Sequence, residues 1–256
     1  MSTPPEEPPF TAAAEERIRR RWFRALTRWT DRVRPQVLAG DGAPQAQNVG
    51  QNRALWGDLM RSEVEPEISS LLQRVRNRVT GRDESVVDAD AAAYLNEAGN
   101  RLARVPDEVY SLIVREIEQG VGRGESIPDI RSRVQGVLTA SGGEYWPNRA
   151  TVVARTETQG AVNAGAYFGA VRDAALRGDP APFKVWLSTK DKRTRPSHVL
   201  ADQQRTLLTE PFIVGGARLL FPGDPRGPAQ EVIQCRCTLL PVTLGEDLDW
   251  RDRQDP

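Results

Sequence analysis

The sequence predicts an α+β protein with a mainly helical N-terminal half, followed by a small mixed or antiparallel sheet module packed on a long helix. Up to Leu176, apolar residues recur at three- and four-residue spacing, which is typical of amphipathic helices. After Gly178 the pattern changes to short alternating segments separated by glycine and proline, which indicates strands and hairpins. Rare side-chain types also gather near the C-terminus, which indicates a compact unit there.

The composition excludes some classes of protein. Acidic and basic residues balance at 35 each, so net charge alone does not favour a nucleic-acid partner. No apolar run approaches the roughly 18 residues of a membrane span, and no membrane partner is expected. Two cysteines separated by one residue are poor disulfide partners, which favours folding in a reducing cytoplasm.

The N-terminal region divides into three predicted segments. Residues 1–14 are rich in proline and acids and are expected to be a disordered tail. Residues 15–38 form a basic amphipathic helix that Pro35 ends or kinks. Residues 39–51 are rich in Gly, Pro, Gln and Asn and indicate a linker.

The basic helix admits three interpretations. It could be a solvated helix packed on its own bundle, a docking helix for another protein, or a helix that contacts phosphates of DNA or lipid without reading sequence. The linker favours docking, because a tethered helix can reach a separate surface. In that interpretation tryptophan and arginine side chains would bind the partner. They are Trp22, Trp29, Arg20, Arg21, Arg24 and Arg28.

Residues 52–143 are predicted to form a helical domain. Its first helix runs to about Val79, and Pro66 could split it. An Ala-rich helix covers about 83–103. Pro106 suits the first turn of the next helix, and Ser126 can cap a short one.

Residues 144–243 are predicted to form the α+β module, and residues 244–256 a loose acidic tail. A long helix covers about residues 148–176. Predicted strands follow it at 183–188, at 212–214 with 218–221 as a hairpin around a Gly-Gly turn, and at 237–242. The first alternates like a half-buried strand, and Pro241 indicates that the last lies at an edge.

Three potential soft metal ligands lie in this module. His198 is the single histidine of the chain, and Cys235 and Cys237 are its two cysteines. A structural Zn²⁺ would require a fourth ligand. The candidates for an oxygen ligand are Asp191, Asp202, Asp224 and Glu157. The alternative is that the histidine makes a buried hydrogen bond and the cysteines pack as small apolar residues.

Further motif residues stand in a defined order along the module. They are Arg155, Thr156, Glu157, Trp186, Asp191, Arg193, Arg195, His198, Asp224, Glu231 and Arg236. This set resembles the Mu F-like minor head proteins of tailed bacteriophages, also called phage head-morphogenesis proteins. The resemblance covers about residues 124–242. The resemblance depends on the Asp-x-Arg-Thr-Arg-x-x-His motif followed by the Cys-Arg-Cys motif, because either motif alone is weak evidence for the family.

The charged residues of this set have two interpretations. Buried charges must be paired, so arginine–carboxylate pairs are expected to hold the long helix against the sheet. The rival interpretation is an active site, either of a degenerate ADP-ribosyltransferase-like enzyme or of a metal-dependent nuclease. Ser188-Thr189 matches the transferase strand poorly, and no Glu-x-Glu follows it.

The resemblance implies a structural role without catalysis. It implies a minor capsid protein that binds the portal protein and is incorporated into the procapsid. Other head proteins and packaged DNA, bound without sequence specificity, are further expected partners. The expected location is the virion, inside the capsid near the portal, after assembly in the host cytoplasm. A DNA-binding accessory protein that needs no portal stays an alternative.

Overall fold

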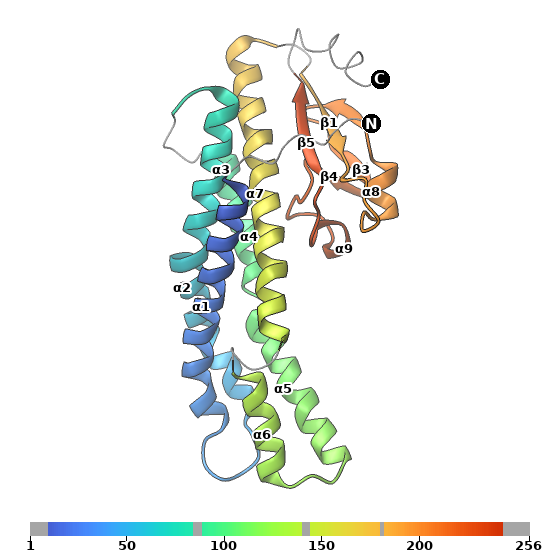
Figure 1. The fold of residues 1–256 in the computed structure, drawn as a ribbon. Coiled ribbons are helices and arrows are strands. Elements are labelled where there is room, and N and C mark those ends of the chain that lie inside the picture. Colours follow the sequence, from blue (N-terminus) through green and yellow to red (C-terminus); the bar gives the residue numbers. More distant parts are fainter. Residues whose placement is uncertain (1–9, 84–88, 140–143, 180–181, 243–256) are drawn as a thin grey trace. The chain divides into compact units, whose positions relative to one another are not determined.

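The computed structural model describes residues 10–83, 89–139, 144–179 and 182–242, and it confirms the α+β class. Figure 1 shows helices filling the chain up to Arg177, with the strands after them. The chain forms two compact units. The helical unit comprises Arg17–Pro66 and Ala98–Thr151, and the mixed unit comprises Met1–Glu16, Glu67–Glu97 and Val152–Pro256. The predicted domains follow chain order, whereas these units join distant segments. Residues 1–9 of the tail predicted at 1–14, and the whole tail predicted at 244–256, lie outside the described residues.

Three tryptophans form the centre of the helical unit. Trp22 and Trp29 lie on α1 (Thr11–Val37) and meet Trp56 of α2 (Arg53–Leu59) edge to face, with centroids 6.1 and 5.7 Å away. All three side chains are fully buried. The Trp29 indole N–H donates to the Asn52 carbonyl at 2.8 Å, and that of Trp56 to the Leu102 carbonyl at 2.9 Å. The hypothesis that Trp22 and Trp29 anchor a partner is therefore wrong for this conformation, because both are core residues.

The basic helix differs from its predicted ends. It begins at Thr11, inside the segment expected to be disordered, and continues past Pro35 to Val37. The segment after it is no free tether, since η1 (Ala46–Asn52) buries Val49 and supplies the carbonyl that Trp29 uses. The fixed η1 removes the reason for which docking was favoured.

A widened helical turn replaces the break expected at Pro66. Between α2 and α3 (Glu65–Thr80), residues Met60–Val64 form the π-helical segment η2. Pro66 is the second residue of α3 and has no N–H to donate to a carbonyl of the preceding turn. The π segment absorbs the irregularity, as such segments commonly do inside α-helices.

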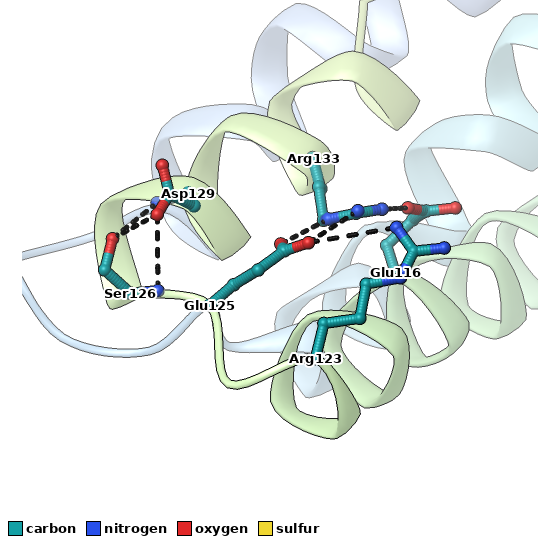
Figure 2. Close-up of polar contacts among 6 residues, drawn as sticks. All are labelled: Glu116, Arg123, Glu125, Ser126, Asp129 and Arg133. Atoms are coloured by element: carbon teal, nitrogen blue, oxygen red, sulfur yellow. Dashed lines mark hydrogen bonds and ion pairs between the residues drawn. The ribbon is translucent and has the colours of Figure 1, made fainter.

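The turn between α5 (Val105–Gly122) and α6 (Ile127–Val137) is closed by polar contacts (Figure 2). Ser126 accepts the backbone N–H of Asp129, whose carboxylate accepts the Ser126 N–H in return, so the predicted cap is confirmed as a capping box. The Arg133 guanidinium donates to both oxygens of Glu125 at 2.5 and 2.7 Å and to Glu116 at 3.0 Å. These hydrogen bonds lower the pKa of Glu125.

In the mixed unit, α7 (Tyr145–Arg177) packs closely on α3 and lies beside α4 (Ala89–Leu102) in Figure 1. A Cβ at Gly165 would lie 2.6 Å from the Leu72 carbonyl oxygen and 2.8 Å from the Val75 side chain. Any larger residue would push the helices apart. The small residues of α7 thus set how closely its backbone approaches α3.

The sheet module follows α7 in the chain. A three-stranded antiparallel sheet has the order β2-β1-β5, from Arg205–Leu207, Phe183–Leu187 and Thr238–Val242. A two-stranded ribbon pairs β3 (Phe212–Val214) with β4 (Ala217–Leu219) through the predicted Gly-Gly turn. Short helices α8 (Pro196–Leu200) and α9 (Ala229–Val232) complete the module.

One strand prediction holds, one needs correction, and one strand was missed. β5 lies at an edge, as Pro241 indicated. β1 is buried on both faces and not on one, because Phe183 and Val185 join Val242 while Trp186 packs on Phe212. β2 was not predicted. None of its three residues is buried, so the strand has no apolar inward face that a sequence pattern could reveal.

Candidate metal centre

His198 lies at the centre of the module, with its two ring nitrogens facing different groups. Its Nδ1 is 3.2 Å from Cys237 Sγ and 3.8 Å from Cys235 Sγ. The three potential ligand atoms lie within 4.8 Å of one another, and all three residues are buried. The structure therefore brings together the three soft ligands predicted from the sequence. One imidazole and two thiols make a donor set that suits Zn²⁺.

The opposite ring nitrogen meets a buried carboxylate. His198 Nε2 is 3.0 Å from Glu231 Oε2, which also accepts the Ser197 hydroxyl at 2.8 Å. The Gly-Gly turn of the β3–β4 ribbon makes room for this carboxylate. Gly215 has a φ of +56°, and a Cβ there would lie 2.3 Å from Glu231 Oε1. A glycine is thus required at this turn both for its backbone conformation and for the space.

The two thiols differ in acidity because they interact. A hydrogen bond from the Cys237 thiol lowers the pKa of Cys235, and the same pairing with burial raises the pKa of Cys237 well above its usual value. Cys235 is further favoured as a thiolate by the charge of Arg195. Of the two thiols, Cys235 is therefore the more readily deprotonated.

The loop that carries the cysteines is held from several sides. Gln234, next to Cys235, has a left-handed φ of 55°, which is uncommon for a non-glycine residue. Its backbone N–H donates to Thr156 Oγ1 on α7 at 3.0 Å. Arg195 donates from Nη2 to the Ile233 carbonyl. Trp186 packs its ring edge to face on His198, with centroids 5.4 Å apart.

Two amides on α7 join the helix to the module, and the sequence analysis missed both. Gln159 Nε2 donates to the Cys237 carbonyl at 2.9 Å. Asn163 Nδ2 donates to the carbonyls of Pro222 and Cys237 at 2.9 and 3.0 Å, and its Oδ1 accepts the Leu239 N–H at 2.9 Å. With Thr156 these amides form a polar line at three- and four-residue spacing on a helix otherwise rich in small and apolar residues. This spacing of polar residues on one side of the helix is the sequence feature that could have predicted the junction.

Lys184 is a second missed residue. It lies on β1 with its side chain fully buried, and Nζ donates to the carbonyls of Leu208 and Leu220 at 2.8 Å each. The ammonium also lies over the rings of Tyr167 and Phe212, 4.8 and 5.1 Å from their centroids. Burial lowers the pKa of Lys184 to about 7. No sequence signal marks this lysine, since strand alternation is compatible with a solvent-facing position.

Each carboxylate considered as a fourth ligand either pairs with another group or lies outside the cluster formed by the histidine and the two cysteines. Asp191 pairs with both terminal nitrogens of Arg236. Asp224 accepts the Leu220 N–H and pairs with Arg226 at 2.6 Å. Asp202 accepts the Ser188 N–H at 2.8 Å. Glu157 is buried, yet in the described part of the chain the cluster contains only the histidine and the two cysteines.

Two arginines of the motif, Arg155 and Arg193, do not form the expected ion pairs between the long helix and the sheet. The Arg155 side chain is half exposed and pairs with Glu15 of α1 at 3.2 Å, not with a carboxylate of the sheet module. The Arg193 side chain is 75% exposed and approaches Asp191 only to 3.6 Å. The expectation that arginine–carboxylate pairs join the long helix to the sheet is therefore wrong for these residues. The amides of Gln159 and Asn163 make that junction.

The geometry does not match a serine hydrolase. Such a site needs a hydroxyl that donates to the imidazole, with an acid behind the imidazole. Here the Ser197 hydroxyl donates to Glu231, so the carboxylate stands between the serine and His198. The buried imidazole faces thiols instead of a nucleophilic hydroxyl. The arrangement binds and orients but does not activate a serine.

Comparison with known proteins gives one match. The sequence model described as Phage Mu protein F like protein matches residues 111–240, slightly more than half of the chain. The matched segment runs from α5 to β5 and includes every residue of the His198 site. No curated protein and no solved structure matches the chain significantly. Among the described helices, none has the length and apolar character needed to cross a membrane.

Proposed function

The chain belongs to the Phage Mu protein F like family, and on this basis we propose that it is a minor head protein of a tailed bacteriophage. The family is associated with phage head morphogenesis. In this proposal the protein binds the portal vertex inside the head during procapsid assembly and DNA packaging, and it stays in the virion. Its role is to bind and assemble, not to catalyse. The family match over residues 111–240 is the observation that carries the proposal.

The sheet module offers a surface suited to a protein partner. Leu200 on α8 is 86% exposed, and Val199 beside it and Ile213 on β3 are about half exposed. α8 contacts β3, so these apolar side chains belong to neighbouring elements of one module. Exposed apolar side chains on neighbouring elements often mark protein interfaces. These residues replace the buried tryptophans of α1 as the portal-binding residues to be tested first.

Co-purification of the full chain with the portal protein of the same phage tests the proposal. The two proteins should stay associated, and Leu200→Asp should weaken the association by placing a charge in the apolar contact. Val121→Asp is the matched control, because Val121 is an equally apolar exposed residue on α5, outside the module. If the wild-type chain and the portal protein do not associate at low or high salt, the portal role is wrong.

Contact with packaged DNA is a second function favoured by one observation. Arg20, Arg24 and Arg28 lie on the exposed side of α1. Arginines on one face bind phosphates without reading sequence, and such binding weakens steeply with salt. Deleting residues 15–38 would remove the tryptophan core, so Arg24→Glu is the cleaner variant. It should lower affinity for duplex DNA of any sequence. Unchanged affinity, or affinity insensitive to salt, would exclude this surface.

A further inference from the structure

We propose that His198, Cys235 and Cys237 bind a structural Zn²⁺ that fixes the sheet module of this protein. The inference is independent of the portal role, because it rests on the geometry of three side chains. Their ligand atoms all lie within 4.8 Å of one another. Tetrahedral zinc places nitrogen and sulfur ligands about 2.0–2.3 Å from the ion, so its ligand atoms are about 3.5–3.8 Å apart. The observed separations of 3.2 and 3.8 Å from Nδ1 to the two sulfurs need little adjustment.

The groups around the histidine favour ligation over simple burial. A metal-ligating histidine usually donates its other ring N–H to a carboxylate, which fixes the tautomer and orients the ring. Glu231 occupies that place at 3.0 Å from Nε2, so the Nδ1 lone pair faces the two thiols. Glu231 is itself oriented by Ser197, and the space for it depends on Gly215.

The position of the site indicates a structural ion. The three ligands are buried, and they join α8 to the loop that leads into β5. The sheet of the module is small. The apolar cluster on one of its faces consists mainly of Phe183, Val185 and Val242. A bound ion adds folding free energy where the apolar core is limited. In the described chain no fourth protein ligand joins the group, so water or another small ligand would take the fourth position, which a protein side chain fills in most structural zinc sites.

Metal content and cobalt spectroscopy of the full chain test the site. The protein, expressed with zinc and purified under reducing conditions, should contain about one zinc per chain. Replacement by Co²⁺ should give thiolate-to-cobalt charge transfer and the visible bands of tetrahedral cobalt. The Cys235→Ser, Cys237→Ser double variant should lose the ion, whereas Arg193→Ala, an exposed change in the nearby loop, should retain it.

Several results would overturn the inference. Less than about 0.1 equivalent of zinc in the wild-type chain would do so. So would an ion that the double-serine variant retains, because the ion would then lie elsewhere. If that variant does not fold, the cobalt spectrum of the wild-type chain decides alone, since the absence of a thiolate band excludes cysteine ligation.

Glu231→Gln separates ligand orientation from ligation. It should weaken zinc affinity about 10–100-fold in competition with a chelator, while the cobalt spectrum keeps its thiolate band. Unchanged affinity would remove the positioning role of Glu231.

Discussion

The helical unit and the sheet module are stabilised in different ways. The helical unit buries three tryptophans against one another, and two of the indoles donate to backbone carbonyls. The sheet module buries polar groups, among them Lys184, His198 and Glu231, and the buried Asn163 of α7 donates to its carbonyls. Apolar burial is non-directional, whereas a buried polar group costs free energy unless it has a partner in the correct geometry. The helical unit should therefore tolerate small shifts that the sheet module cannot.

Removing the central tryptophan should have the largest effect. Trp56→Ala removes the ring between Trp22 and Trp29 and the hydrogen bond to the Leu102 carbonyl. We expect a loss of about 3–5 kcal/mol in the free energy of unfolding, measured by denaturant titration with circular dichroism. Arg24→Ala on the exposed side of α1 should change it by less than about 0.5 kcal/mol. A loss below about 1 kcal/mol for Trp56→Ala would mean that this core is not tightly packed.

The matching test in the sheet module is Asn163→Ala. It leaves the Leu239 N–H and the carbonyls of Pro222 and Cys237 without this partner. The expected cost is roughly 2–4 kcal/mol, because buried unpaired groups lose their desolvation free energy. Amide hydrogen exchange along β5 should speed up. Asn148→Ala, an exposed change on the same helix, is the control. Equal effects of the two variants would contradict the polar-core interpretation.

The buried lysine makes the sheet module sensitive to pH. Its pKa is about 7 in the folded chain against 10.5 for an unperturbed lysine. Between these values the unfolded chain binds the proton and the folded chain does not. Stability should therefore rise with pH from about 7 to 10, by at most about 1.4 kcal/mol per pH unit. Lys184→Met should remove this rise, and the exposed change Lys192→Met should keep it. Identical pH profiles for wild type and Lys184→Met would show that the ammonium stays charged.

The smallest effect concerns the capping box of the helical unit. Ser126→Ala removes the acceptor for the Asp129 N–H at the start of α6 and should cost about 1 kcal/mol. Ser111→Ala is the control, since the Ser111 hydroxyl only donates to the Asp107 carbonyl within α5. The midpoint of denaturation measures both. No difference between the two variants would show that the cap does not limit stability.

The elements set by near neighbours in the chain were predictable. The first-turn position of Pro106, the Ser126 cap and the Gly215-Gly216 hairpin depend on a few consecutive residues, and the structure has all three. The approach of His198 to the cysteines was also predictable, because rare residue types of one chemistry stood in one short region. In this case the scarcity of these residue types indicated a contact between positions that are distant in the chain.

Burial of individual side chains could not be predicted in the same way. Trp22 and Trp29 look like interface anchors on an isolated arginine-rich helix, yet Trp56, from another helix, covers them. Lys184 looks like an exposed strand residue until Leu208 and Leu220 supply its acceptors.

The sequence by itself determined the α+β class, the order of the long helices and of most strands, and the grouping of the soft ligands. Only the tertiary structure decided which polar groups are buried, which partners satisfy them, and how distant segments join into two units. The physical reason is the distance along the chain over which each kind of interaction acts. Helical periodicity and turn chemistry act between residues a few positions apart, whereas Asn163 meets the Cys237 carbonyl across 74 positions of the chain.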